Sequence, residues 1–328
     1  MCKEKKGVLC GLLFALIILM IVGWSELVRS QEKYPTKAID WITPFGPGGG
    51  SDLAARILAG HLRNMWKVPV NVINKPGGNS VPACVEVYAA APNGYTMLIE
   101  STPSSTYLPF VVKNLPFKVM DRTFVAIATS SPQILGVPYG SPLSSIKDVE
   151  AEAKKDPGEF TWTSLGGAGG MDINSRLFFK AIGVEISKTR PVVSQGGGQA
   201  AILVSGGNVK MGFNTVAGYL PAISGKLVRP FAITGRTRYP GLPDLPTTAE
   251  VGYPTVNYEY WVGVAGPPNL PSYVLDKWNA ALKEILKDPE IVSKLKNIGA
   301  IPFYLNAHDT KEFVAKEAEE GGQLYGLK

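Results

Sequence analysis

Hydrophobic residues along the chain fall into short continuous runs and into longer segments of helical spacing, joined by glycine- and proline-rich turns. An apolar run at 38–43 precedes an amphipathic segment at 51–64. Further strands are predicted at 68–73 and 96–100, with a helix at 81–88 between them. This β-α-β-α-β order with short connections predicts a parallel, doubly wound sheet.

A second series of strands and helices begins near residue 124, which indicates a second α/β domain. Strands are predicted at 124–128, 133–137, 160–164, 190–193, 209–213 and 228–234, with helices at 144–155, 173–182 and around 202–204. A strand at 258–264 and helices at 272–286, 289–298 and 310–324 follow. These last helices most simply pack on the first domain. The predicted division is 31–131 plus 248–328 for domain 1 and 132–247 for domain 2.

Residues 1–30 have the pattern of a secretory signal peptide. Lys3, Lys5 and Lys6 precede an uninterrupted apolar run at 8–24, and cleavage is expected after Ser30. The alternative is a retained membrane anchor, because the run is at the short end of what spans a bilayer.

Composition and charge narrow the class of ligand. Removing residues 1–30 lowers the net charge from +6 to +4, and no block dense in lysine and arginine remains, so a nucleic-acid surface is not indicated. After this removal Cys84 is the one cysteine left in the sequence, and its apolar helical context predicts a small buried side chain. A mild positive field suits a small anionic ligand, but an ordinary solvated surface accounts for the net charge at least as well.

Glycine-rich turns precede four of the predicted helices. They are PFGPGGGSD at 44–52, NKPGGNS at 74–80, GGAGG at 166–170 and QGGGQ at 195–199. A strand, a glycine turn and a helix start together aim backbone N–H groups at an anion. In the first turn we expect Ser51 to be the N-cap and Asp52 to lie in the first helical turn.

These turns do not match nucleotide-binding or catalytic motifs. The P-loop lysine is missing after Gly46, and Ser51 stands where a dinucleotide fingerprint needs its last glycine. Trp162 occupies the place of a glycine that a nucleophile elbow requires. The two histidines, His61 and His308, lie outside the glycine turns. Anion binding without chemistry is therefore predicted, with no catalytic residue, metal or cofactor.

Several short motifs occur in an order typical of one protein family. They are YPTK at 34–37, PFGPGGGSD at 44–52, NKPGGN at 74–79, PNGYT at 92–96, KDPG at 155–158, GKLVR at 225–229, LPDLPTTAE at 242–250 and GPP at 266–268. Together they resemble the substrate-binding proteins of tripartite tricarboxylate transporters, of the TctC or Bug type. The resemblance covers essentially the whole chain after the signal. It implies a type II periplasmic-binding-protein fold, in which two doubly wound α/β domains close around a ligand cleft.

The resemblance also implies a set of ligand-binding residues, which hold a carboxylate through glycine-loop backbone and helix N-termini, partly through waters. Carried over position by position, they are Gly48, Gly49, Ser51, Asp52, Ser101, Thr102, Ser164, Gly166, Gly167, Gly170, Gln195, Gly196, Asn214 and Thr215. The family often has an aspartate–asparagine pair at 214–215 and a tyrosine–lysine–glycine stretch near 194–196. This chain has fewer charges there, which leaves the specificity for the far end of the ligand open.

The expected function is that of a periplasmic solute-binding protein. It captures a mono-, di- or tricarboxylate or an aromatic acid, and delivers it to the membrane subunits of a tripartite permease. A ligand sensor that docks to a membrane receptor is one alternative. A cleft enzyme is another, but it needs a base or metal set facing the glycine turns. Tyr258, Tyr260 and Trp261 could stack on an aromatic acid, although aromatic residues more often pack in the core.

Overall fold

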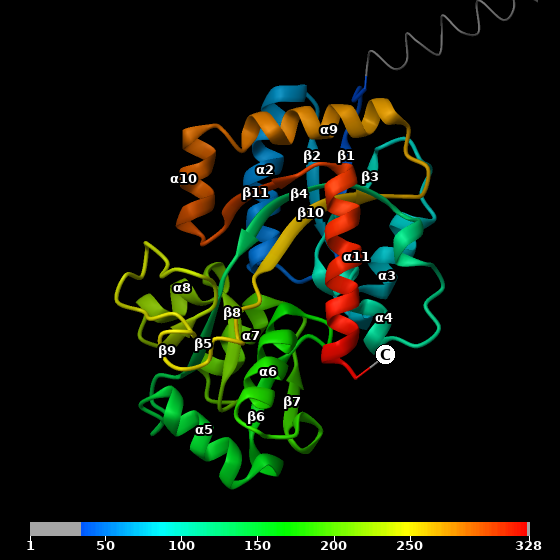
Figure 1. The fold of residues 1–328 in the computed structure, drawn as a ribbon. Helices are drawn as coiled ribbons and strands as arrows, with labels where there is room; N and C mark the ends of the chain where they lie inside the picture. Colours follow the sequence, from blue (N-terminus) through cyan, green and yellow to red (C-terminus); the bar gives the residue numbers. More distant parts are fainter. Residues whose placement is uncertain (1–33, 327–328) are drawn as a thin grey trace, which may run out of the picture.

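The computed structural model describes residues 34–326, which form two lobes (Figure 1). The predicted signal at 1–30 lies outside these residues. In the view of Figure 1 the first lobe is at the top and the second at the bottom. Among the helices of residues 34–326, none has the length and apolar character needed to cross a bilayer.

The first lobe is built on a six-stranded sheet of order β11-β4-β10-β3-β1-β2. Its strands are β1 (Ile39–Thr43), β2 (Val70–Asn74), β3 (Thr96–Glu100), β4 (Thr123–Ser131), β10 (Tyr260–Gly266) and β11 (Ile301–Leu305). Its helices are α2 (Gly50–Trp66), α3 (Val81–Tyr88), α4 (Leu108–Val111), α9 (Ser272–Ile285), α10 (Pro289–Asn297) and α11 (Ala307–Leu324).

The second lobe contains a three-stranded sheet of order β8-β5-β9 and the pair β6-β7. Its strands are β5 (Gln133–Pro138), β6 (Thr161–Ser164), β7 (Arg190–Val193), β8 (Gly212–Thr215) and β9 (Val228–Ile233). Its helices are α5 (Ile146–Lys155), α6 (Gly170–Ala181), α7 (Gly197–Ser205) and α8 (Val216–Ser224). The chain crosses between the lobes after β4 and again after β9. The domain boundaries given above stay a prediction.

The strand pairing confirms part of the expected topology and changes the rest. Strand β1 pairs in parallel with both β2 and β3, as the β-α-β-α-β order predicts. Strand β10 then inserts between β3 and β4 and runs antiparallel to both, which makes the sheet mixed. Strand β5 is likewise antiparallel to β8 and β9, because it enters the second lobe directly from β4. Strand β11 was not predicted, since Pro302 interrupts its pattern; proline is tolerated there because β11 is an edge strand.

Tryptophan packing fixes the direction of α2 in the first lobe. The Trp278 ring of α9 contacts the rings of Trp41 and Trp66 edge-on, at centroid distances of 5.3 and 5.0 Å. Its indole N–H donates to the hydroxyl of Tyr34 at 2.9 Å. Leu58 of α2 is fully buried against the same core. The middle and the C-terminal end of α2 are therefore anchored in the core of the first lobe.

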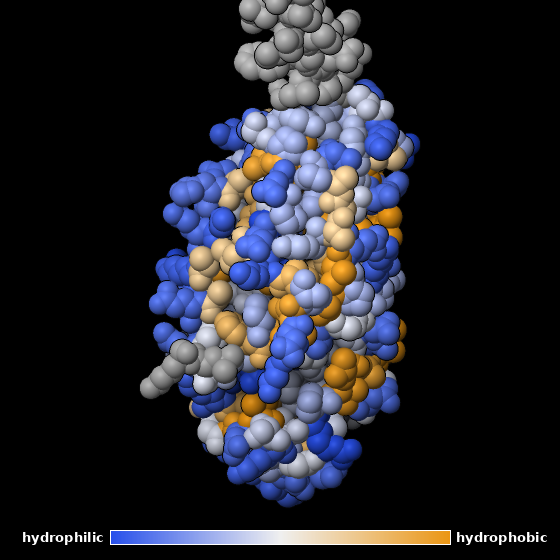
Figure 2. Space-filling model, turned by 90° about the vertical axis from the view of Figure 1, so that its right-hand side faces the viewer, coloured by the Kyte–Doolittle hydropathy of each residue, from blue (hydrophilic) through white to orange (hydrophobic). Residues whose placement is uncertain are grey.

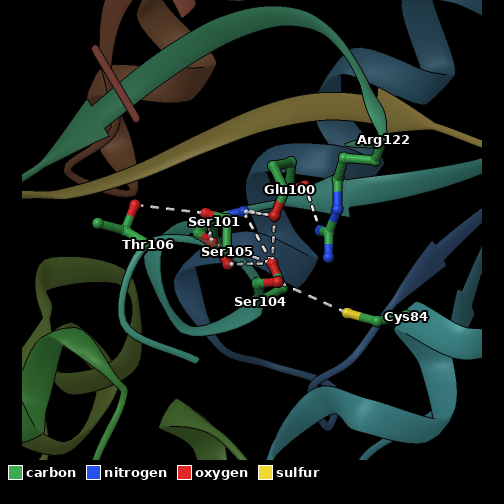
Figure 3. A network of polar contacts seen from close by, with 7 residues as sticks. All are labelled: Cys84, Glu100, Ser101, Ser104, Ser105, Thr106 and Arg122. Atoms are coloured by element: carbon green, nitrogen blue, oxygen red, sulfur yellow. Dashed lines mark hydrogen bonds and ion pairs between the residues drawn. The ribbon is translucent and has the colours of Figure 1, made fainter. Parts of the chain in front are cut away.

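A buried ion pair shapes the turn that follows β3 (Figure 3). The Glu100 carboxylate lies 2.6 Å from Nη1 of Arg122, and the two side chains are 1% and 4% exposed. The Ser101 N–H and the Ser104 hydroxyl also donate to Glu100, at 3.2 and 2.6 Å. The serine-rich turn at 101–105 is thus folded around one buried carboxylate.

Cys84 packs under the same turn, as expected for a small buried side chain. Its exposed fraction is 2%, and its thiol lies 3.7 Å from the carbonyl oxygen of Ser104. Burial raises the pKa of the Cys84 thiol to about 11, so it remains a thiol at neutral pH.

Replacing Arg122 by methionine should lower the free energy of unfolding by about 3–5 kcal/mol, because it leaves the Glu100 charge buried without a partner. The measurement is chemical denaturation at pH 7. Arg238→Met is the matched control, since Arg238 pairs with Glu250 at the surface and such pairs contribute little. Equal effects of the two substitutions would contradict a structural role for the buried pair.

Candidate functional site

Four helices begin around one small cavity between the lobes. Helix α2 comes from the first lobe, and helices α6, α7 and α8 come from the second. The cavity measures about 30 Å³. It is lined by Phe45, Gly49, Gly50, Ser51, Gln133, Leu165, Gly170, Met171, Gly196, Gly197, Asn214, Thr215 and Tyr260.

The first glycine loop differs from the prediction in its cap. The N-cap of α2 is Gly49 rather than Ser51, and Ser51 lies buried inside the first turn. The cause is the conformation of the loop, in which Gly48 has φ +78° and the chain becomes helical one residue before Ser51. Ser51 nevertheless lines the cavity.

Asp52 holds this loop in shape. Its carboxylate accepts the Gly48 N–H at 3.0 Å, the Asn74 side-chain amide at 2.9 Å and the Arg56 guanidinium at 2.9–3.1 Å. Burial acts to raise the pKa of Asp52, but the hydrogen bonds from Arg56, Asn74 and Gly48 outweigh it and lower the pKa below its ordinary value. Asp52 is therefore an ionised support of the loop, and it does not line the cavity.

The loop before α6 repeats this design with Asp172. Its carboxylate accepts the N–H groups of Leu165, Gly167 and Gly169 at 2.9–3.0 Å, and also the hydroxyl of Ser164. Here burial dominates and raises the pKa of Asp172. Sequence reasoning missed Asp172, although the signal was present: GGSD at 49–52 and GGMD at 169–172 share the pattern Gly-Gly-x-Asp.

The remaining two helix starts are fixed by amide and hydroxyl groups. The Gln199 side chain accepts the Gln195 N–H at 2.7 Å, as the two aspartates do in their loops. Thr215 is the N-cap of α8 and accepts the Gly218 N–H at 3.3 Å. Asn214 donates to the carbonyl oxygen of Gly197 at 2.8 Å, which ties the α7 and α8 starts together.

The glycine loops of the two lobes lie in direct contact. The Gly46 N–H donates to the carbonyl oxygen of Gln195 at 2.8 Å. A Cβ atom on Gly49 would lie 3.2 Å from the nitrogen of Gly197, and one on Gly50 would lie 2.8 Å from Oγ1 of Thr215. The glycines therefore serve two purposes, since they lead into the helices around the cavity and also let the lobes approach.

Two residues that line the cavity come from outside the glycine loops. The Oε1 atom of Gln133, at the start of β5, accepts the Asn174 amide of α6 at 2.7 Å. Tyr260, at the start of β10, is buried, which raises its pKa to about 12 despite hydrogen bonding to Ser101 and Ser51. Gln133 carries no local sequence signal, whereas Tyr260 was considered for stacking on an aromatic acid; both reach the cavity only through tertiary structure.

The predicted binding residues fall into two sets. Those that line the cavity are Gly49, Ser51, Gly170, Gly196, Asn214 and Thr215. Those placed around it are Gly48, Asp52, Ser164, Gly166, Gly167, Gln195, Ser101 and Thr102. Ser101 lies behind Tyr260, and Thr102 bonds the hydroxyl of Tyr258. Ligand contact by either set stays a prediction.

The cavity can attract an anion although no charged side chain of the described residues lines it. None of the described residues that line it is Lys, Arg, His, Asp or Glu. Each helix N-terminus presents roughly half a positive charge together with unpaired N–H groups. Four such ends around one small space provide the electrostatic attraction.

A buried carboxyl group lies below the serine-rich turn. Glu317 of α11 is 9% exposed and accepts the hydroxyl of Thr106 at 2.6 Å and the Trp261 indole N–H at 3.0 Å. Burial raises the pKa of Glu317 to about 7, against these hydrogen bonds.

Comparisons with known proteins place this geometry in a family. Residues 54–326 match the model described as "Tripartite tricarboxylate transporter family receptor" (TctC). BugT of Bordetella pertussis is 28% identical over 294 residues, which cover 88% of this chain and 89% of BugT.

Two solved structures are similar throughout. Periplasmic binding protein BugD has a TM-score of 0.83 and 25% identity, covering 90% of this chain and 99% of that one. Rpa4515 of R. palustris, solved with adipate, has a TM-score of 0.84, 25% identity and the same coverage. These likenesses confirm the expected periplasmic-binding-protein fold.

Glu317→Gln should flatten the dependence of stability on pH. The folded pKa of about 7 is above the ordinary value of 4.5, so wild-type Glu317 stabilises the fold below about pH 4.5 and loses this contribution as the pH rises through 7. At pH 8 the glutamine variant should gain up to about 3 kcal/mol in unfolding free energy. Denaturation from pH 4.5 to 8 tests this, with Glu319→Gln, at an exposed position of α11, as the control. An unchanged pH profile in the glutamine variant would contradict it.

Proposed function

The chain belongs to the tripartite tricarboxylate transporter family of receptors, and on this premise we propose that it captures a small organic carboxylate between its lobes. The observation that carries the proposal is the meeting of four helix N-termini, from α2, α6, α7 and α8, at one cavity free of charged side chains. Helix N-termini bind carboxylates through their first N–H groups and through the helix dipole.

Both lobes contribute to the attraction, which couples binding to closure. The first lobe supplies the N-terminus of α2, and the second supplies those of α6, α7 and α8. A carboxylate meets all four only when the lobes are together, so it binds the closed arrangement more tightly than the open one. This difference in affinity shifts the equilibrium toward closure.

The cavity also sets how a ligand enters. A volume of about 30 Å³ accommodates roughly two water molecules. An acid of several carbon atoms therefore requires the loop contacts at Gly46 and Gly49 to separate and then close again on the ligand. Phe45, Leu165 and Met171 supply the apolar part of the lining for its carbon skeleton.

The family supports transport without chemistry as the physiological role. The lining residues offer hydroxyl and amide groups but no His, Cys, Asp, Glu or Lys that would act as base, nucleophile or metal ligand. We therefore propose a non-enzymatic protein of the periplasm, exported by the segment at 1–30. Its closed form would be recognised by the membrane subunits of a tripartite permease, to which it delivers the acid.

A thermal-shift panel tests the proposed ligand class. Mono-, di- and tricarboxylates and aromatic acids, adipate included, are compared with neutral amides of the same skeletons. A bound acid at a hundred times its Kd should add about 2.7 kcal/mol to the unfolding free energy, and its amide should add none. Equal stabilisation by acids and amides, no stabilisation by any acid, or turnover of the acid would each contradict the proposal.

Gly50→Ala tests whether the lobes must close at this cavity. Its Cβ would lie 2.8 Å from Oγ1 of Thr215, so binding of the best acid should weaken by about tenfold or more. Gly60→Ala is the matched control in the same helix, because nothing lies within 4 Å of its Cβ position. That variant should gain about 0.5–1 kcal/mol in stability and bind normally. Titration calorimetry compares the two, and equal affinities would place the site elsewhere.

A further inference from the structure

Tyr325, which follows α11 in the first lobe, reaches across to the second lobe. Its hydroxyl donates to the carbonyl oxygen of Gly167. Its ring lies 4.2 Å from the guanidinium of Arg176, measured from Cζ to the ring centroid. The rings of Tyr107 and Phe110 also lie near it, at centroid distances of 5.5 and 5.6 Å.

The residues around Tyr325 form a small hydrophobic cluster drawn from both lobes. Its buried members are Tyr107 of the first lobe and Ala168 and Ile173 of the second. Figure 2 looks at the side of the molecule on which α11 and α4 lie in Figure 1, and shows apolar residues in orange at mid-height among polar ones. The contact of Tyr325 is therefore part of a packed junction between the lobes.

Tyr325 acts on the loop that leads into α6. The Gly167 N–H is held by Asp172 within the second lobe at 3.0 Å, while its carbonyl group is held by Tyr325 from the first. Gly166 is also covered from the first lobe, since a Cβ atom there would lie only 1.8 Å from Oδ1 of Asn79. Gly170, three residues after Gly167, lines the cavity. The first lobe thus contacts the second lobe next to the N-terminus of α6.

Tyr325 remains a hydrogen-bond donor at neutral pH. Burial, together with the nearby Asp172 carboxyl, raises the pKa of Tyr325 above its ordinary value. The Arg176 guanidinium over the ring adds a cation–π attraction between the lobes. Both interactions exist only while the lobes are together.

We propose that Tyr325 is a closure latch, a positioning residue that favours the closed arrangement and so raises affinity for a ligand it does not touch. Tyr325 does not line the cavity. Observed affinity scales with the fraction of molecules in the binding-competent arrangement, so a weaker latch weakens binding in proportion. That Tyr325 raises ligand affinity rests on the proposed function, whereas that it favours the closed arrangement of the lobes does not.

Hydrogen–deuterium exchange of the full-length protein without ligand tests closure directly. Tyr325→Phe keeps the ring and removes the hydroxyl, so the protein should still fold. The informative amide is that of Gly46, which bonds Gln195 across the cleft and does not contact Tyr325. We expect its exchange, and that of the loop at 165–170, to become about two- to tenfold faster, the range that one hydrogen bond supplies.

Tyr304→Phe is the matched control. Its hydroxyl donates to Oδ1 of Asn279 at 2.8 Å, within the first lobe, so exchange at Gly46 should match the wild type. Arg176→Met removes the cation over the Tyr325 ring and should act in the same direction as Tyr325→Phe. If exchange becomes faster only at 165–170, Tyr325 contributes local packing alone and the latch is overturned. Unchanged exchange at both Gly46 and 165–170 would also overturn it.

Adipate titration adds the second readout. The Kd of Tyr325→Phe should rise by the same two- to tenfold factor, and that of Tyr304→Phe should not change. Binding of adipate with wild-type affinity in Tyr325→Phe would overturn the latch and leave the proposed function intact. If no acid of the panel binds the wild type, the proposed function fails, and the exchange at Gly46 alone decides the latch.

Discussion

The contact between the glycine loops of the two lobes leaves no room for a Cβ atom at several positions, and the cleft of this protein depends on that constraint. Gly49 of the first lobe faces Gly197 of the second, and Gly50 faces the side chain of Thr215. The same glycine turns lead into the helices whose N-terminal ends lie around the cavity. Close approach and anion attraction are thus two results of one choice of residue.

The two lobes stabilise their loops with the same device but in different electrostatic settings. Asp52 has the Arg56 guanidinium beside it, whereas Asp172 is held by hydrogen bonds from backbone N–H groups and from Ser164. Burial dominates at Asp172 and raises its pKa against these hydrogen bonds, whereas at Asp52 the hydrogen bonds from Arg56, Asn74 and Gly48 outweigh burial and lower the pKa. In both loops the carboxylate takes N–H groups from the turn itself and leaves the first helical turn to the cavity.

Local patterns predicted the strand, glycine turn and helix units, because each is fixed by residues close in sequence. The Ser51 cap was wrong, since the positive φ of Gly48 moves the helix start and no pattern of residue types reveals that angle. Asp52 was predicted as a ligand-binding residue from the family resemblance, but its role in holding the loop was not predicted, because its partner Asn74 is distant in sequence. Gln133 was not predicted, and Tyr260 was considered only for stacking on an aromatic acid, since long-range strand pairing alone brings both to the cavity.

The contact between Trp261 and Glu317 has a spectroscopic consequence. The indole N–H donates to a carboxyl group, and the ring is 1% exposed, so solvent does not quench it directly. Trp261 lies on β10, the strand that brings the chain back from the second lobe. The emission wavelength of this indole therefore reports the charge beside it, which gives the protein an intrinsic optical probe next to its interlobe crossing.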